Sequence, residues 1–380
     1  MSASATSTPR LAFITSSRSD LAKLRPYIYF FVKHRFPVSL FITSMHVNAQ
    51  LSFSREEIQS YFPKGVRLFW DESFPQQQPV NALTHVLGAF DIFLTQEKTD
   101  FVFIHGDRME AFAAASAAAL RQLPICQIEA GDTSGNIDES LRHAITKLAH
   151  RFLVDTPVAK QRVLQLGEDP RSVFMTGASA LSLLPDDTQQ RRLYVKYDLH
   201  KPYVMVLYHP ITGLTPAEQY RCAAELVEQL ASLELRYVVL PPNNDPGYPE
   251  ILRAFNLFPK DRTTFLPSIP AEDYLTLLRH TSCLVGNSSS GAKDAPLLGV
   301  PSVLVGSRQH NRTQGLNFPY CKQVKNAQQA AKCVRDFVAH PPQMRKQSLS
   351  AGALEKLLEK IFTPSFFKPN LQKFFYDQSR

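Results

Sequence analysis

Three carboxylates in the middle of the chain have the residue types and spacing to move protons: Asp107, Glu129 and Asp138. The first two follow short apolar runs, residues 101–104 and 124–128, which predict buried parallel strands. A carboxylate at the carboxyl end of such a strand faces the crevice where α/β proteins bind ligands. Asp138 falls at the start of a predicted helix, so the three form a candidate acid/base set. The alternative is that Asp107 and Asp138 are only loop or helix-cap acids.

A segment rich in small hydroxyl residues further along the chain predicts an anion site. It closes a predicted strand, opens a predicted helix, and consists of Asn287, Ser288, Ser289, Ser290 and Gly291. Such a segment offers backbone and side-chain donors to a diphosphate at a helix N-terminus. Asp294, one turn later, could accept both ribose hydroxyls. The alternative for the serines is a helix cap, although three in a row exceed what a cap requires.

Other polar residues also fall at the ends of predicted strands. Arg18 lies in the turn 15–20 after the first strand, and Arg308 follows the strand 302–305. Guanidinium groups at these turns would suit a bound anion, although Arg18 could equally belong to an ordinary strand–helix turn. His209 follows the strand 203–208, and the turn 243–247 contains Asn244 and Asp245. A lone histidine is usually structural and the turn could be only a turn.

Strand and helix signals alternate along the whole chain. Predicted strands cover residues 11–15, 37–43, 101–104, 124–128, 151–154, 173–176, 203–208, 237–240, 264–266, 283–286 and 302–305. Predicted helices cover 20–34, 80–96, 109–121, 138–149, 157–166, 216–232, 271–279, 291–298 and 327–339. The polar segment 178–202 predicts a linker between two such series. The alternation predicts an α/β fold of the GT-B class, in which two doubly wound Rossmann-like domains face a central cleft.

The predicted domains follow from this pattern. Residues 1–9 are expected to form a disordered tail, and 10–180 an N-terminal Rossmann-like domain that carries the acids. Residues 181–360 are expected to form the nucleotide-binding domain. The tail 361–380 is helical and aromatic in this prediction and packs back on the N-terminal domain.

Composition narrows the functional class. A chain of 380 residues with 44% apolar and 20% charged residues is typical of a globular protein with two domains. No apolar run is long enough to predict a membrane span, and the N-terminus lacks the apolar core of a signal peptide. Five scattered cysteines without C-x-x-C spacing predict reduced thiols in a cytoplasmic protein, without a metal site. The first turn is not G-x-G-x-x-G, so no dinucleotide cofactor is expected.

The formal charge of +8 has three explanations. The first is binding to nucleic acid. However, the lysines and arginines are spread along the chain, without the basic runs and interleaved aromatics expected of a nucleic-acid binder. A polyanionic small molecule such as a nucleotide diphosphate is at least as good an explanation. Solubility alone is the third.

The motifs together resemble the UDP-N-acetylglucosamine 2-epimerase family, and more closely its hydrolysing branch. The matching segments are 17–20, 105–108, 128–150, 207–212, 242–247, 286–291 and 306–309. The resemblance implies substrate-binding roles for Arg108, Arg142 and His143 besides the residues above, no cofactor or metal, and a homodimer or homotetramer. Departures occur at the first turn, at Ala130 and Asp132, and at Asp294, where the family has Glu. They leave the sugar specificity open.

The resemblance also implies a reaction. UDP-N-acetylglucosamine, or a 2,4-diacetamido-trideoxy relative, would lose UDP to give a 2-acetamidoglucal, and water would add with the opposite configuration at C2. The free sugar, of the N-acetylmannosamine type, would enter sialic or related nonulosonic acid synthesis. Asp107, Glu129 and Asp138 would share the proton transfers, with Asp107 or Asp138 as base and Glu129 as acid. Arg18, His209, Ser289 and Ser290 would hold the departing diphosphate. The alternatives are a reversible, non-hydrolysing epimerase, a GT-B glycosyltransferase and a non-catalytic nucleotide-sugar sensor.

Overall fold

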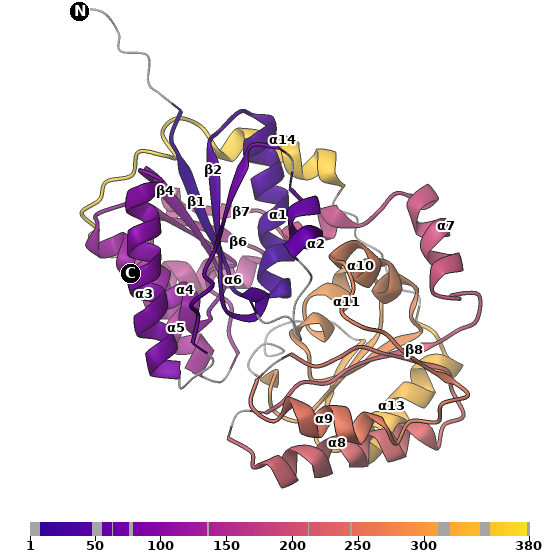
Figure 1. Ribbon diagram of the computed structural model, residues 1–380. Coiled ribbons are helices and arrows are strands. Elements are labelled where there is room, and N and C mark those ends of the chain that lie inside the picture. Colours follow the sequence, from indigo (N-terminus) through magenta and orange to yellow (C-terminus); the bar gives the residue numbers. More distant parts are fainter. Residues whose placement is uncertain are drawn as a thin grey trace, which may run out of the picture. The chain divides into compact units, whose positions relative to one another are not determined.

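The chain folds into two compact units, each built on its own parallel sheet (Figure 1). The computed structural model describes residues 8–47, 55–62, 64–75, 79–134, 137–211, 213–243, 245–310, 320–342 and 350–377. Unit 1 comprises Met1–Asp132, Ile137–Ala180 and Ala351–Arg380, and unit 2 comprises Thr133–Asn136 and Leu181–Ser350. The predicted fold class, two parallel-sheet α/β domains of the GT-B type, is confirmed.

Unit 1 contains a seven-stranded sheet in the order β3-β2-β1-β4-β5-β6-β7. Its strands are β1 (Leu11–Thr15), β2 (Val38–Ile42), β3 (Val66–Trp70), β4 (Phe101–His105), β5 (Ile125–Ile128), β6 (Arg151–Val154) and β7 (Val173–Met175). Its main helices are α1 (Arg18–Lys33), α3 (Pro79–Gln96), α4 (Met109–Leu120), α5 (Ile137–Leu148) and α6 (Pro157–Gln165). The strand order reverses between β1 and β4. Ligands bind outside the carboxyl ends of the strands at such a switch point.

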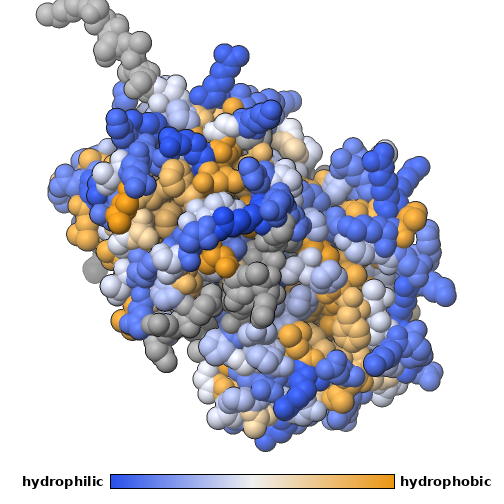
Figure 2. Space-filling view, in the orientation of Figure 1, coloured by the Kyte–Doolittle hydropathy of each residue, from blue (hydrophilic) through white to orange (hydrophobic). Residues whose placement is uncertain are grey.

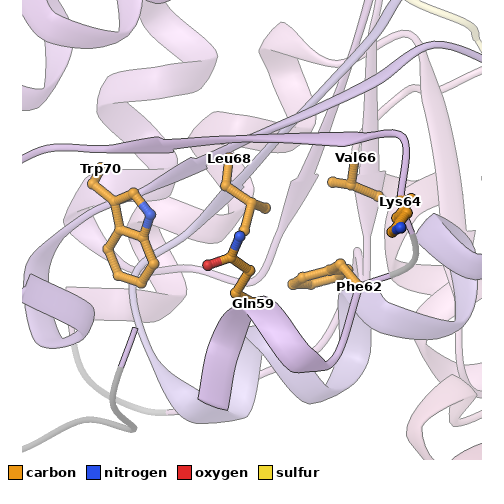
Figure 3. A pocket seen from close by; sticks show the side chains of 6 residues that line it. All are labelled: Gln59, Phe62, Lys64, Val66, Leu68 and Trp70. Atoms are coloured by element: carbon orange, nitrogen blue, oxygen red, sulfur yellow. The ribbon is translucent and has the colours of Figure 1, made fainter. Parts of the chain in front are cut away.

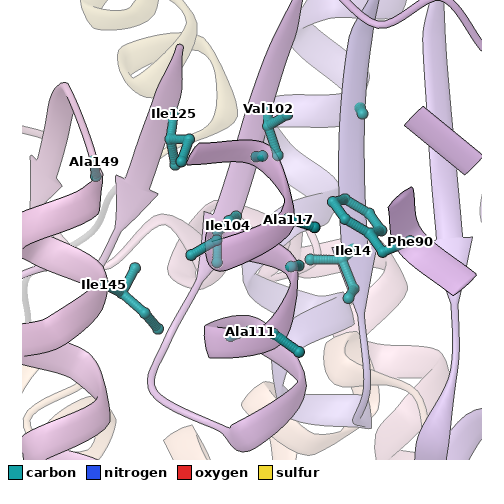
Figure 4. Packing of buried hydrophobic residues seen from close by; sticks show 14 of the residues in the cluster. Ile14, Phe90, Val102, Ile104, Ala111, Ala117, Ile125, Ile145 and Ala149 are labelled. Atoms are coloured by element: carbon teal, nitrogen blue, oxygen red, sulfur yellow. The ribbon is translucent and has the colours of Figure 1, made fainter. Parts of the chain in front are cut away.

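The two faces of this sheet are buried in different ways. Val102 and Ile104 of β4 pack with α3 and α4, where alanines such as Ala117 let the helix approach the strands closely (Figure 4). Phe101 and Phe103 point to the opposite face because side chains alternate along a strand. There they meet aromatic rings from α1 and from the end of the chain: Phe31, Phe362, Phe366 and Phe367.

The C-terminal segment is only partly helical. Helix α14 (Ala351–Ile361) ends before the aromatic residues, so the prediction that the whole tail is helical is wrong. The non-helical part is held by side chains of unit 1 instead, since Arg151 donates from Nε to the carbonyl oxygen of Phe366 at 3.1 Å. Lys373 reaches Glu168 at 2.8 Å. Phe374 and Phe375 remain exposed, so not every ring of the tail is covered within the described residues.

Unit 2 contains a six-stranded sheet in the order β10-β9-β8-β11-β12-β13. The strands are β8 (Val204–Leu207), β9 (Tyr237–Val239), β10 (Thr263–Phe265), β11 (Cys283–Gly286), β12 (Ser302–Val305) and β13 (Cys321–Val324). The helices include α7 (Asp187–Lys196), α8 (Pro216–Ala231), α9 (Tyr248–Phe255), α10 (Ala271–His280) and α13 (Ala327–Ala339). The switch point lies between β8 and β11. A Cβ on Gly286 would lie 2.0 Å from the carbonyl oxygen of Leu207, so only glycine fits there.

Several elements differ from the sequence-based prediction. The predicted linker 178–202 contains helix α7, which Asp186 caps by accepting a hydrogen bond from the backbone N–H of Gln189. The predicted helix 291–298 is a 3-10 turn (Ser289–Gly291) followed by the four-residue helix α11 (Asp294–Leu297). The anion site predicted at a helix N-terminus therefore has no full helix behind it.

The visible surface is mainly hydrophilic. Blue residues cover much of the face shown in Figure 2, with smaller hydrophobic areas between them. Among the described residues, no helix combines the length and apolar character needed to cross a membrane.

Candidate active site

The acids of unit 1 are positioned by three neighbouring strands. Strand β1 pairs with β4, and β4 pairs with β5, all in parallel, so their carboxyl ends lie along one edge. Asp20 lies in the first turn of α1, shortly after β1, Asp107 follows β4, and Glu129 directly follows β5. The predicted placement of Asp107 and Glu129 at strand ends is what the structure shows.

Glu129 contacts two groups in the interior of unit 1, Lys23 and His105. Its Oε2 accepts a hydrogen bond from Nζ of Lys23 at 2.8 Å and lies 3.5 Å from Nε2 of His105. Glu129 is only 9% exposed, so this carboxylate is paired where water cannot screen it well. Its φ of 59° places it in the left-handed region, which non-glycine residues adopt at a cost of about 1–3 kcal/mol. Strain of this kind is concentrated at functional sites.

Asp20 lies on the other side of the same imidazole. Its Oδ1 is 3.5 Å from Nδ1 of His105, and its Oδ2 accepts hydrogen bonds from the backbone N and the Oγ of Ser16 at 3.0 and 2.7 Å. Burial raises the pKa of Asp20, but His105, Arg108 and Ser16 together lower this pKa well below its usual range. Asp20 is therefore an ionised, fixed acceptor. His105 contacts both carboxylates.

Asp107 is held separately, by an ion pair with Arg142 of helix α5. The Arg142 side chain is 3% exposed, and its Nη1 also donates to the carbonyl oxygen of Asp132 at 2.9 Å. Gln127 of β5 donates from Nε2 to the carbonyl oxygen of Arg142 at 3.0 Å and accepts from Oγ1 of Thr146 at 2.7 Å. These bonds fix α5 to β5. The position of Asp107 is thus set by the sheet through the helix.

Helix α5 carries two further predicted residues. Asp138 lies one turn before Arg142, so both occupy the same face of the helix. His143 is half-buried, and its Nδ1 makes no hydrogen bond to a described residue. Burial lowers the pKa of His143, and the neighbouring Arg142 lowers it further. His143 is therefore expected to be neutral near pH 7.

The two predicted arginines of unit 1 are also at this edge. Arg18 opens α1 directly after its N-cap Ser17, and burial lowers its pKa. Arg108 contacts Glu110 at 3.3 Å, and its positive charge contributes to the low pKa of Asp20. Both arginines therefore add positive charge to the strand-end edge, where it would attract an anionic ligand.

His209 of unit 2 is held by the neighbouring strand end. Its backbone N donates to Oδ1 of Asn287 at 2.7 Å, and Nδ2 of Asn287 donates to the carbonyl oxygen of His209 at 2.8 Å. The Nδ1 of the ring accepts from the backbone N of Asn243 at 3.0 Å. A neutral His209 therefore carries its proton on Nε2. The ring is oriented as a donor, which suits an anionic group.

The three serines have different local roles. Ser288 caps the 3-10 turn by accepting from the backbone N of Ser290. Ser290 accepts a hydrogen bond from Tyr274 and donates to Asp294 at 2.7 Å. The Asp294 carboxylate, predicted to accept ribose hydroxyls, thus accepts from Ser290 in this structure. Ser289 is half-buried and makes no side-chain hydrogen bond to a described residue, so its hydroxyl is the best placed of the three to donate to a ligand.

Other predicted residues complete this edge. Arg308 donates from Nη1 to the carbonyl oxygen of Asn287 at 3.2 Å, and its Nη2 lies 3.9 Å from Asp245. Gly291 ends the 3-10 turn, close to Leu304 of β12. Asn244 lies outside the described residues. Within unit 2, the carboxyl ends of β8, β9, β11 and β12 therefore bring a histidine, hydroxyl groups and an arginine to one edge.

Some residues of both edges were not predicted as site residues. In unit 1 these are Asp20, Lys23 and His105. In unit 2 they are Asn243, Tyr274 and Gln309, whose Nε2 donates to the carbonyl oxygen of Asn287 at 3.0 Å. Asp20 and Lys23 are three residues apart on α1, which places them on one helix face. His105 is the last residue of β4 and stands two positions before Asp107. Strand-end position was the signal that could have identified His105.

A pocket lies elsewhere in unit 1, between the edge strand β3 and helix α2 (Arg55–Ser60). Val66, Leu68 and Trp70 of β3 line one side, and Gln59, Phe62 and Lys64 line the other (Figure 3). None of the predicted site residues lines it, and it holds none of the acid or anion-binding groups described above. The strand-end edge of each unit therefore remains the candidate location of functional residues in that unit.

Known proteins with similar sequences identify the family. The family model described as UDP-N-acetylglucosamine 2-epimerase matches residues 32–356. A UDP-N-acetylglucosamine 2-epimerase of Neisseria meningitidis is 33% identical over 386 residues, which cover 97% of this chain and 99% of that protein. A UDP-N,N'-diacetylbacillosamine 2-epimerase (hydrolyzing) of Legionella pneumophila is 27% identical and covers 81% of this chain and 84% of its own.

A solved structure shows the same fold. The Methanocaldococcus jannaschii UDP-GlcNAc 2-epimerase, solved in complex with UDP-GlcNAc and UDP, has a TM-score of 0.75 and 17% sequence identity. The match covers 92% of this chain and 99% of that one. Together with the strand-end acids and the family model, which spans most of both units, these similarities show that the chain belongs to the UDP-N-acetylglucosamine 2-epimerase family.

Proposed function

We propose that the chain is a hydrolysing epimerase, which converts UDP-N-acetylglucosamine or a 2,4-diacetamido-trideoxy relative, with water, to UDP and the free 2-epimeric sugar. One observation carries this proposal. The strand-end edge of unit 1 holds two acids in separate charge environments, Glu129 with Lys23 and His105, and Asp107 with Arg142. Separate environments let two carboxylates take different protonation roles.

The reaction explains why several acids are needed. The C2 proton of the sugar is barely acidic, so a base alone removes it slowly. Cleavage of the bond from C1 to the diphosphate develops positive charge on the ring and makes that proton easier to remove. Loss of the C2 proton and of UDP gives a 2-acetamidoglucal. Water then adds its hydroxyl to C1 while a proton returns to C2 from the opposite face.

Three proton transfers follow from this scheme, and three acids are available. One group takes the C2 proton, another returns a proton to the other face, and a third handles the water at C1. We assign Asp107 or Asp138 as the base and Glu129 as the acid. The contacts of Glu129 support this assignment, because an acid beside His105 and Lys23 has nearby groups that can supply it with a proton again.

Unit 2 would bind the leaving group. Because Nδ1 of His209 accepts a hydrogen bond, the proton of the neutral ring is on Nε2, which is suited to donate to a phosphate oxygen. Ser289 and Ser290 would add hydroxyl groups and Arg308 positive charge, and Arg18 of unit 1 would contribute a second guanidinium. Charge that develops on the departing diphosphate is best stabilised by such fixed donors.

The hydrolysing reaction is favoured over the reversible one by the sequence motif at residues 135–140. Relatives with hydrolysing activity in their names, such as the Legionella pneumophila protein, support the same choice. The products separate the alternatives: a reversible epimerase yields a UDP-linked 2-epimer, and a glycosyltransferase requires an acceptor. A non-catalytic sensor would bind UDP tightly without turnover. The free product sugar would serve sialic or related nonulosonic acid synthesis.

The proposal is tested by incubating the protein with UDP-N-acetylglucosamine in D2O. We expect UDP and a free 2-epimeric sugar that carries deuterium at C2. Asp107→Asn and Glu129→Gln should abolish UDP release and leave UDP binding nearly unchanged. A UDP-linked sugar as the sole epimer would refute hydrolysis, and near-normal turnover of either variant would refute the acid/base assignment.

A further inference from the structure

The imidazole of His105 lies between two buried carboxylates without a hydrogen bond of ordinary geometry. Nε2 is 3.5 Å from Glu129 and Nδ1 is 3.5 Å from Asp20. Both ring nitrogens are fully buried, and neither makes a hydrogen bond to a described residue. A buried polar atom in this state costs about 1–3 kcal/mol. Such an arrangement needs an explanation beyond packing.

A purely structural role would be that His105 neutralises the two acids. Each acid, however, already has other partners. Lys23 donates to Glu129 at 2.8 Å, and Ser16 donates twice to Asp20, whose charge is also stabilised by Arg108. Neither acid depends on His105 alone as a counter-ion.

The surroundings of Asp20 set the proton position on the ring. Asp20 accepts two hydrogen bonds from Ser16, at 3.0 and 2.7 Å, and these bonds favour its ionised form whatever the charge of His105. An ionised carboxylate next to Nδ1 favours the neutral tautomer with its proton on that nitrogen. The lone pair of Nε2 then points toward Oε2 of Glu129. The same logic orients the histidine of a catalytic triad.

We propose that Asp20, His105 and Glu129 form a proton relay, in which His105 takes a proton from Glu129 and returns it while Asp20 holds the ring. His105 and Asp20 are thus positioning residues for the acid of the proposed reaction, and the inference rests on that proposed function. One proton moves, from Oε2 of Glu129 to Nε2 of His105 and back. No other bond is made or broken.

The charges around the relay allow this transfer. When Glu129 is protonated and His105 neutral, Asp20 and Lys23 carry one negative and one positive charge. After transfer, Glu129 and Asp20 are both negative, and Lys23 and His105 are both positive. The net charge of these four groups is the same in both states, so the buried cluster needs no exchange of ions with solvent.

The first test reads the ring directly and does not require activity. Nitrogen-15 NMR of histidine-labelled protein, with the His105 signals identified by their loss in His105→Gln, should show the proton on Nδ1 near pH 7. Asp20→Asn should move it to Nε2, and Glu129→Gln should shift the Nε2 signal. A proton on Nε2 in the unchanged protein, or on both nitrogens from about pH 6 to 8, would overturn the relay.

The second test measures turnover in the same D2O assay. His105→Gln should lower kcat about 10²- to 10³-fold, the range expected for one proton-transferring group, with little change in KM. In His105→Gly, added imidazoles should restore turnover in proportion to their basicity. If His105 only filled space, the restored turnover would depend on the size of the added imidazole instead. If His105→Gly does not fold, His105→Gln alone decides, and near-normal kcat in it would overturn the proposal.

A matched control is available in the same unit. His85 contacts Asp71 at 2.8 Å and does not contact Glu129, so His85→Gln should leave kcat unchanged. The unchanged protein separates the two proposals. If it fails to release UDP, the proposed function is wrong whatever the NMR shows, whereas normal UDP release with normal His105→Gln turnover refutes the relay alone.

Discussion

Asp107→Asn should destabilise unit 1 as well as abolish turnover, because Arg142 would remain buried without its counter-ion. The Arg142 side chain is 3% exposed and that of Asp107 is 21% exposed. Removal of one partner of a fully buried pair costs about 3–5 kcal/mol. Two features reduce this cost here. Nη1 of Arg142 keeps its bond to Asp132, and Asp107 is partly hydrated before the change.

We therefore expect a loss of about 2–3 kcal/mol in the free energy of unfolding. For a domain of roughly 150–250 residues, each kcal/mol lowers Tm by about 2–4 °C, so the expected decrease is about 4–12 °C. Trp70, the single tryptophan of the chain, lies on β3 of unit 1. Its fluorescence during urea unfolding reports on the unit that contains the change.

Asp100→Asn is the matched control, since Asp100 pairs with Arg10 in the same unit but both side chains are 44% exposed. Solvent screens this pair, so its loss should have little effect on the unfolding midpoint. If Asp107→Asn were no more destabilising than Asp100→Asn, the buried Arg142 would not depend on Asp107. The argument from burial would then be refuted.

Three further changes test other parts of the structure. Asn287→Ala removes the side-chain oxygen and nitrogen that bind the backbone of His209. It should lower the free energy of unfolding by about 2–4 kcal/mol and weaken UDP binding. An unchanged Kd for UDP, measured by calorimetry, would contradict this. Burial lowers the pKa of His46 to about 4, so the unfolded chain binds an extra proton as the pH falls from 6.5 to that value. The free energy of unfolding should decrease by up to about 3 kcal/mol over this pH window. In His46→Gln the midpoint of urea unfolding should depend less on pH within the same window. Phe366→Ala should lower the free energy of unfolding by about 3–5 kcal/mol, measured by thermal unfolding. Phe374→Ala should change Tm little, because the Phe374 ring is 74% exposed.

The strands that position the site were predictable because they are buried on both faces. A buried parallel strand reads as a continuous apolar run, and β4, β5, β11 and β12 were located this way to within a residue. The edge strands β3 and β13 were missed because their side chains are largely half-exposed and mix polar with apolar types. Helix α7 was taken for a linker because it is polar on nearly every face.

The sequence by itself determined which residues stand at strand ends: Asp107, Glu129, His209 and the serines after β11. This follows from local order alone, since a residue after a buried strand must lie at its carboxyl edge. Only the tertiary structure decided which charges meet there. Lys23, His105 and Asp20 reach the region of Glu129 from α1 and β4, and Arg142 reaches Asp107 from α5. Pairing between side chains far apart in the chain depends on strand order and helix placement, which no local pattern encodes.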